Sequence, residues 1–272
     1  MLATQHGKER QLARPFAVIG LEVSVVEGLD TDLLGTFTGE IDRVGSPREV
    51  ALHKARLGIA HAGVPVGLAS EGSFGPHPSS PFVAADHELL AFVDDDLGIE
   101  IVEGILSLDT NHDATTVASA DQLDPFLERA GFPHHGVVVR PASHWDPDAS
   151  RKGIRDPRLL THAVARAAVS STDGLALVAT DMRAQMNPTR QRVIRRLGFR
   201  LARRLAQRCP ACRTPGYGIV DVVRGLPCEL CAAPTDLVTD EVFGCARCAH
   251  RDRRSRRDLV AAPAGQCPWC NP

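Results

Sequence analysis

The sequence predicts an α/β domain followed by a small cysteine-rich module. Along residues 1–206, segments with the alternation or apolar runs typical of strands occur between segments with helical start and stop signals. All eight cysteines lie after residue 208, in four Cys-x-x-Cys pairs. Strands that alternate with helices favour a mixed central sheet flanked by helices. We therefore expect two domains, residues 1–206 and residues 207–272.

The clearest helical signal in the first half of the chain is Ser46-Pro47-Arg48-Glu49. It combines an N-cap serine, a proline at the first helical position and the glutamate of a capping box. The helix is predicted to run to about Ala62, because Gly63 then supplies a stop signal.

Strand signals lie on both sides of this helix. Residues 20–26 alternate between apolar and polar positions, and residues 64–68 form a short apolar run. The next segment, residues 69–78, is rich in glycine, serine and proline and is predicted to be a shaped loop. Two further strands are predicted at residues 88–93 and 99–106.

The second half of the α/β domain repeats this alternation. A helix is predicted at residues 121–130, before Gly131, and another at residues 157–170. Strands are predicted at residues 136–140 and 175–180. Ligands of α/β domains bind at the carboxyl ends of strands, which directs attention to the segments after Leu68 and Thr180.

A last, strongly basic helix begins at Asn187. Asn187 is a good N-cap, and Pro188 suits the first helical position. The net charge is −12 over residues 1–181 but +9 over residues 182–208, which hold nine arginines and no acid. The helix either balances an acidic face in solvent or forms a phosphate-binding edge.

The cysteine pairs predict bound metal. No signal peptide and no membrane-spanning run is evident, so we expect a cytoplasmic protein whose thiols stay reduced. Thiolates at this spacing suit tetrahedral zinc, and all-cysteine sites are structural because they leave no open coordination position. We expect two zinc ions. Their ligands are Cys209, Cys212, Cys228, Cys231, Cys245, Cys248, Cys267 and Cys270.

The gaps between successive pairs are 15, 13 and 18 residues, as in zinc ribbons. Residues 217–223 and 237–243 are the expected hairpin strands. Sequential, interleaved and nested pairings of the four knuckles all remain open. Sequential pairing is favoured, because each gap then closes a ribbon-sized loop.

Three motifs of the α/β domain follow one another in an order that is typical of a known family. They are the segment Ala3-Thr4-Gln5-His6-Gly7-Lys8-Glu9, a helix with Glu49, Ala51, Lys54 and Ala55, and a strand that ends in Ser70-Glu71-Gly72. This order resembles the first third of the inosine/xanthosine triphosphate pyrophosphatases, which open with a Thr-x-Asn-x-x-Lys phosphate loop. Asp181-Met182-Arg183-Ala184 occupies a place comparable to the Ser-His-Arg segment of that family.

The resemblance implies a pyrophosphatase-like α/β fold and Mg²⁺-dependent hydrolysis between the α and β phosphates of a nucleoside triphosphate. The implied catalytic and metal-holding acids are Glu49, Glu71 and Asp181. The residues implied to contact the nucleotide are Thr4, His6, Lys8, Lys54, Arg183, Asn187 and Arg190. Structural roles compete for some of these residues, since Glu49 also completes a capping box and Asp181 can pair with Arg183.

The chain also resembles, over nearly its whole length, an uncharacterised bacterial family of unknown function. The shared features are a Thr-Asp-Met-Arg-Ala-x-x-Asn-Pro-Thr-Arg signature, found here from Thr180 to Arg190, and terminal zinc knuckles. This second resemblance brings no activity with it.

Three hypotheses follow. The first is a metal-dependent nucleotide pyrophosphohydrolase with structural zinc ribbons, whose partner is a nucleotide or another phosphorylated ligand and not a membrane. The second is a nucleic-acid-binding zinc-ribbon protein that uses its arginines and a non-catalytic α/β scaffold. The third is an interaction module with neither activity. The sequence favours the first and leaves the oligomeric state open.

Overall fold

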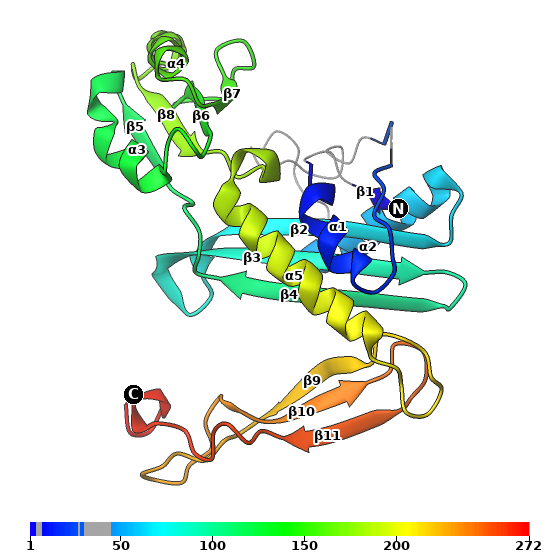
Figure 1. Cartoon of the computed structure of the whole chain (residues 1–272). Helices are drawn as coiled ribbons and strands as arrows, with labels where there is room; N and C mark the ends of the chain where they lie inside the picture. Colours follow the sequence, from blue (N-terminus) through cyan, green and yellow to red (C-terminus); the bar gives the residue numbers. More distant parts are fainter. Residues whose placement is uncertain (4–6, 27, 30–44, 272) are drawn as a thin grey trace. The chain divides into compact units, whose positions relative to one another are not determined.

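The computed structural model describes residues 1–3, 7–26, 28–29 and 45–271. Within these residues the chain forms two compact units. The core unit comprises Met1–Asp95 and Val102–Leu201, and the ribbon unit comprises Asp96–Ile101 and Ala202–Pro272. Helices and open sheets occur together, so the predicted mixed α/β class is confirmed (Figure 1).

The first sheet has the strand order β1-β2-β3-β4. Its strands are β1 (Leu2–Ala3), β2 (Val66–His77), β3 (Ser80–Asp94) and β4 (Ile99–Ser107). β1 pairs with β2 in parallel, whereas β2 and β3 form a long antiparallel hairpin. Of the strand predicted at residues 20–26, only Val25 makes a bridge, to Leu2.

The segment predicted as a loop, residues 69–78, is instead largely the second half of β2. Glycines and a proline are tolerated here because β1 ends at Ala3, so that β2 pairs beyond Ala69 only with β3 among the described residues. An edge position of this kind needs no backbone N–H from Pro76 on its open side. The strand therefore carries Glu71 and Gly72 within a regular ladder.

Three helices accompany this sheet: α1 (Glu9–Ala17), α2 (Pro47–Ala62) and α5 (Pro188–Ala206). The predicted capping box of α2 is present, and the helix ends at Gly63 with φ 63°. α2 packs closely on β2, because a Cβ atom at Gly67 would lie 2.4 Å from the carbonyl oxygen of Ala55. α1 was not predicted. It approaches α5 at Gly198, where a Cβ atom would lie 2.9 Å from Leu12.

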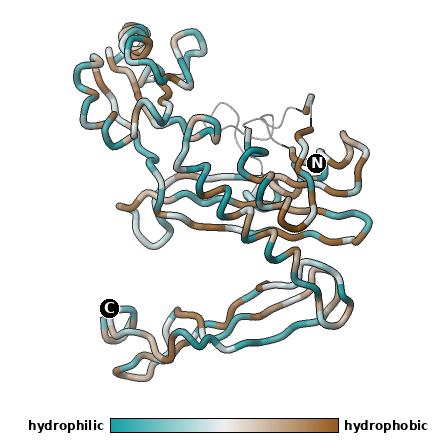
Figure 2. Tube along the Cα trace, in the orientation of Figure 1, coloured by the Kyte–Doolittle hydropathy of each residue, from teal (hydrophilic) through white to brown (hydrophobic). Residues whose placement is uncertain are grey.

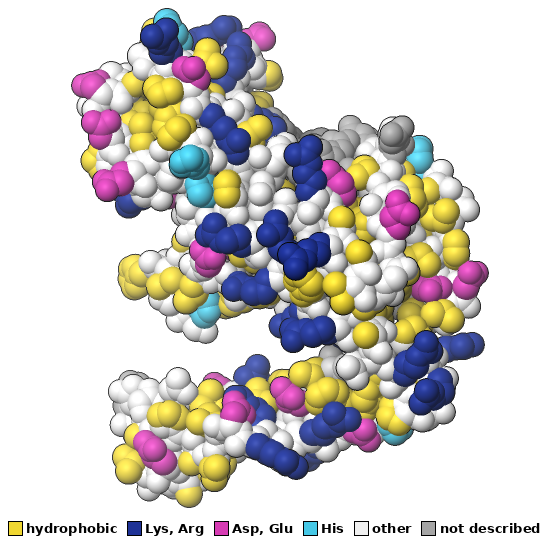
Figure 3. All heavy atoms as spheres, viewed as in Figure 1, with side chains coloured by type: hydrophobic (Ala, Val, Ile, Leu, Met, Phe, Trp, Pro, Cys, Tyr) yellow, Lys and Arg dark blue, Asp and Glu magenta, His cyan; other side chains and the backbone are white. Residues whose placement is uncertain are grey.

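Three arginines of α5 contact the core unit. Arg192, Arg196 and Arg200 follow at intervals of four residues and so share one face of the helix. Arg192 lies 3.5 Å from Asp109, Arg196 donates to the hydroxyl of Ser107 at 3.1 Å, and Arg200 lies 2.6 Å from Glu103. Figure 2 shows how hydrophilic much of α5 is, and basic side chains gather over it in Figure 3.

The other strands of the core unit form a separate antiparallel sheet of order β5-β8-β6-β7, so the expected single central sheet is in fact two sheets. The strands are β5 (Ala114–Val117), β8 (Ala176–Thr180), β6 (Val137–Pro141) and β7 (Arg151–Ile154). Helices α3 (Asp124–Ala130) and α4 (Pro157–Ser170) close its apolar core, in which Leu160, Val164 and Val178 are buried.

The ribbon unit contains one antiparallel sheet of order β11-β10-β9. Its strands are β9 (Gly218–Arg224), β10 (Val238–Gly244) and β11 (Arg251–Ser255). The first two match the predicted hairpin strands. In the part of the chain that the structure describes, no helix is long and apolar enough to cross a membrane.

Candidate functional site

Six charged side chains are buried together in the core unit, and we call them the charge cluster. Each is at most 7 % exposed. They come from the start of α1, from α2, from the neighbouring strands β2 and β3, and from the first turn of α5. The cations are Lys8, Lys54 and Arg190, and the acids are Glu71, Asp86 and Glu88.

The pleat of β2 divides the charge cluster between the two faces of the sheet. Successive side chains of a strand point to opposite faces, so Glu71 shares a face with Ala69, and Gly72 lies on the other face. Ala69 packs with Ala55 of α2. Lys54, the residue before Ala55 in α2, reaches Glu71, with Nζ 2.8 Å from Oε2.

Arg190 occupies the opposite face. Asn187 caps α5 by accepting a hydrogen bond from the backbone N–H of Arg190 at 3.0 Å. The Arg190 guanidinium pairs with Glu88, donates to the carbonyl oxygen of Met182, and lies 5.0 Å from the centre of the Phe74 ring. A fully buried guanidinium is thus fixed by an ion pair, a backbone carbonyl and an aromatic face.

Lys8 precedes α1 and reaches the open edge of β2. Its Nζ donates to the carbonyl oxygen of Ser70 at 3.3 Å. Burial lowers the pKa of Lys8 to about 7, and Arg190 adds to this effect, while Glu88 and Glu71 oppose it. Lys8 is therefore a lysine whose charge depends on which anion is nearby.

Asp86 is the one acid of the charge cluster without a counter-ion among the described contacts. Neither of its carboxylate oxygens has a hydrogen-bond partner, and one oxygen of Glu88 also has none. Burial raises the pKa of Asp86 to about 8, and the neighbouring Glu88 carboxylate adds to the rise. At neutral pH the Asp86 carboxyl group holds a proton unless a cation takes its place.

A cavity of about 390 Å³ opens beside the charge cluster. Gly72 and Phe74 of β2 line it, together with Trp145 and the segment 181–183 after β8. The Asp181 carboxylate accepts hydrogen bonds from the backbone and the guanidinium of Arg183. This volume is within the range of small-molecule sites, and its walls combine aromatic rings with arginines.

The structure brings together four of the predicted site residues: Lys8, Lys54, Glu71 and Arg190 all belong to the charge cluster. Asp181 and Arg183 pair with each other at the wall of the neighbouring cavity, and Asn187 is buried as the cap of α5. Thr4 and His6 lie outside the described residues.

Glu49 stands elsewhere. It lies in the exposed first turn of α2, where its carboxylate accepts hydrogen bonds from the backbone and the hydroxyl of Ser46. These bonds lower the pKa of Glu49. The contacts of Glu49 are thus those of a helix cap and not those of the charge cluster.

Asp86 and Glu88 were missed by the sequence reasoning. The signal that could have found them is their spacing. The two acids are two residues apart directly before the apolar run 89–93, so they must share one face of the strand that this run predicts.

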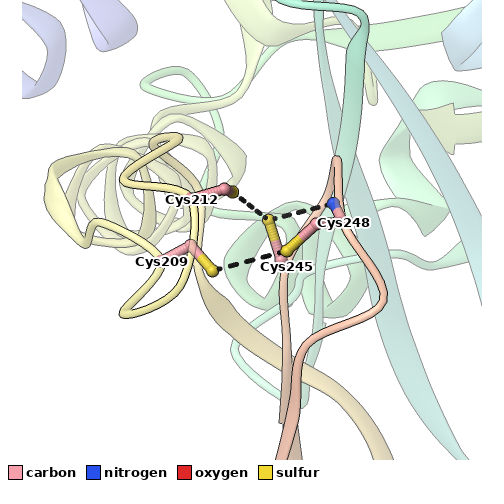
Figure 4. A group of neighbouring side chains, drawn as sticks. All are labelled: Cys209, Cys212, Cys245 and Cys248. Carbon is pink, nitrogen blue, oxygen red and sulfur yellow. Dashed lines mark hydrogen bonds between the residues drawn. The ribbon is translucent and has the colours of Figure 1, made fainter.

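The eight cysteines form two separate groups of four in the ribbon unit, and in each group the sulfur atoms lie within 4.8 Å of one another. The first group is Cys209, Cys212, Cys245 and Cys248, shown in Figure 4. The second group is Cys228, Cys231, Cys267 and Cys270.

This pairing is interleaved, so the favoured sequential pairing is wrong. The reason is the antiparallel ladder, in which Gly218 at the start of β9 pairs with Gly244 at the end of β10. The knuckle before β9 therefore meets the knuckle after β10. The knuckle between β9 and β10 lies at the other end of the sheet, where the chain returns after β11.

The geometry of both groups fits tetrahedral zinc. A zinc–sulfur bond of about 2.3 Å places two sulfurs of a tetrahedron roughly 3.8 Å apart. Cys209 and Cys248 are 3.7 Å apart at sulfur, and Cys228 and Cys270 are 3.9 Å apart. Backbone N–H groups of Leu230 and Arg247 donate to the first sulfur of their knuckles. Both groups can thus hold a metal ion as thiolates.

The comparisons with known proteins find one family. The family model described as "Domain of unknown function (DUF6671)" matches residues 54–272. The matched region contains both cysteine groups and the charge cluster except Lys8. No curated protein matches the chain, and no solved structure matches it.

Proposed function

The chain belongs to the DUF6671 family, and from the charge cluster we propose that it is a metal-dependent phosphohydrolase of nucleoside triphosphates. The observation that carries the proposal is that buried cations from the starts of α1 and α5 and from α2 surround the open edge of β2 beside a cavity, with Lys8 close enough to both Lys54 and Arg190 for each to lower its pKa. Helix N-termini and buried basic side chains are the groups that proteins use to bind phosphate.

The charge cluster would hold the triphosphate, and the cavity would hold the nucleoside. Lys8 is the cation best suited to respond to phosphate, because an added negative charge favours its protonated form. Phe74 and Trp145 in the cavity wall offer aromatic faces to a base. Arg183, at the same wall, would lie between the two parts of the ligand.

The proposed reaction is hydrolysis between the α and β phosphates. A water oxygen bonds to the α-phosphorus, the bond to the bridging oxygen breaks, and a nucleoside monophosphate and pyrophosphate leave. Glu71 would accept the proton of the water, with Lys54 at 2.8 Å holding its carboxylate in place. A divalent metal, when bound, neutralises phosphate charge. The cluster's carboxylates, with their unpartnered oxygens, fit such an ion.

The test uses zinc-loaded full-length protein, Mg²⁺ and a panel of normal and deaminated nucleoside triphosphates, with pyrophosphate release as the readout. We expect release from at least one member of the panel and its loss in the Glu71→Gln variant. Glu128→Gln, which changes an exposed glutamate of α3, is the matched control. Absence of pyrophosphate from every member would end this proposal.

Nucleic-acid binding by the ribbon unit is the second candidate. A groove there is lined by Phe243 and by several arginines, and the Arg254 guanidinium lies 4.1 Å from the centre of the Phe243 ring. Arginine and aromatic side chains together can stack on unpaired bases. Arg253 and Arg256 are already paired, with Asp240 and Asp258, which weakens this candidate. It requires oligonucleotide binding that weakens steeply with added salt; salt-insensitive binding, or none, would exclude it.

A further inference from the structure

The charge cluster contains three buried carboxylate oxygens that receive no hydrogen bond from any described residue. Two belong to Asp86 and one to Glu88, and these side chains are 1 % and 0 % exposed. Buried polar groups are almost always partnered, because burial without a partner costs free energy. The Asp86 and Glu88 carboxyl groups therefore need a positive species between them, which is a shared proton when no metal is bound and a cation when one replaces that proton.

We propose that Asp86 and Glu88 form a divalent-cation site, a proposal that rests on the phosphohydrolase function above. Asp86 and Glu88 are two residues apart in β3, so the pleat directs both side chains to the same face of the sheet. Across the ladder lie Phe74 and Gly72, which line the cavity. The site thus lies next to the cavity, within the charge cluster that would hold the phosphates.

The number of carboxylates indicates which cation fits. Besides the cysteines, no three acidic, histidine or cysteine side chains of the described residues come together as a metal-binding group. A calcium site needs six to eight oxygen ligands. Magnesium is commonly held by one or two carboxylates, with waters and substrate phosphates as the other ligands. Two carboxylates beside a phosphate site therefore match Mg²⁺.

The charge balance predicts how this cation binds. Lys54 offsets Glu71 and Arg190 offsets Glu88, while Asp86 holds a proton when no cation is bound, so a divalent cation alone would displace that proton and add positive charge near Arg190. A polyphosphate alone would bring uncompensated negative charge near Asp86. Bound together they offset each other. The cation and the polyphosphate should therefore each increase the affinity of the other.

Equilibrium dialysis with Mn²⁺ and inorganic tripolyphosphate tests this site on the zinc-loaded full-length chain. Free complexes of Mn²⁺ with tripolyphosphate cross the membrane, so only protein-bound Mn²⁺ accumulates on the protein side. With wild-type protein we expect Mn²⁺ to bind at least tenfold more tightly when tripolyphosphate is present. Asp86→Asn should abolish that increase and still bind tripolyphosphate, and the exposed control Asp95→Asn should behave as wild type.

The outcomes separate the two proposals. Equal Mn²⁺ accumulation by Asp86→Asn and wild type would overturn the cation site, because the metal would then be held by phosphate alone. Tripolyphosphate binding without any Mn²⁺ accumulation by wild type would overturn it as well and leave the phosphate site standing. Failure of wild type to bind tripolyphosphate would count against the phosphohydrolase itself. If Asp86→Asn does not fold, Glu88→Gln, which keeps an acceptor for Arg190, gives the same comparison.

Discussion

Gly72 lies directly opposite Glu88 in the β2–β3 ladder, and the space that a side chain at Gly72 would fill is taken by the Glu88–Arg190 ion pair. A Cβ atom at Gly72 would lie 2.5 Å from Nη2 of Arg190 and 2.6 Å from Oε1 of Glu88. The glycine is therefore required by a close approach and not by its backbone angles. The absence of a side chain at Gly72 leaves room for the buried guanidinium of Arg190 to lie against the face of the sheet.

Replacing this glycine should disturb the charge cluster. We expect Gly72→Ala to destabilise the core unit by about 1–3 kcal/mol, the usual cost of an added methyl group in a packed site. The matched control is Gly75→Ala in the same strand, where a Cβ atom would meet nothing within 4 Å. Urea unfolding of both variants checks the prediction. Equal stability would show that the ion pair can move aside freely.

The Lys54–Glu71 pair should behave as a buried salt bridge. Removing one partner leaves the other charge buried, so Lys54→Met should cost about 3–5 kcal/mol. The double variant Lys54→Met with Glu71→Met should be more stable than the single variant, because neither charge of this pair is left buried without its partner. Unfolding free energies of the four proteins in a double-mutant cycle measure this coupling. Additive single effects would contradict a direct interaction.

Lys8 predicts a pH dependence of phosphate binding. Its pKa of about 7 means that the free protein has lost this charge at alkaline pH. Polyphosphate binding then requires proton uptake by Lys8, so the affinity should fall by up to about tenfold per pH unit above pH 7. The Lys8→Arg variant stays charged and should lack this component. Calorimetric titrations with tripolyphosphate at several pH values, expressed as the ratio of the two proteins, cancel the ligand's own titration.

The interleaved pairing of the cysteine knuckles predicts different zinc contents for two double variants. Cys209→Ser with Cys245→Ser affects a single group and should leave one tightly bound zinc ion per chain. Cys209→Ser with Cys228→Ser affects both groups and should leave none. Elemental analysis of the purified proteins measures the zinc content. Sequential pairing would give the opposite result for the two variants.

Much of the fold follows from local signals. The start of α2 follows from its capping box and its end from Gly63, and the bounds of α4 match those predicted. Asn187 and Pro188 mark the start of α5. These signals depend on interactions within a few residues, so they can be recognised in the sequence without knowledge of the tertiary structure.

What could not be predicted depends on contacts distant in the sequence. Residues 69–78 become a strand only because residues 80–94 pair with them and β1 ends early. The zinc pairing depends on the register of β9 and β10. Asp86 and Glu88 gain their significance from Arg190, which lies about a hundred residues later in the chain and approaches through the space at Gly72.

The most direct test of the central claim is ³¹P NMR of a nucleoside triphosphate incubated with the zinc-loaded chain and Mg²⁺. The charge cluster and its cavity predict a nucleoside monophosphate and pyrophosphate as the products, formed by wild type and not by Glu71→Gln. A nucleoside diphosphate with orthophosphate would contradict the proposed position of attack. An unchanged spectrum for every triphosphate would contradict the function itself.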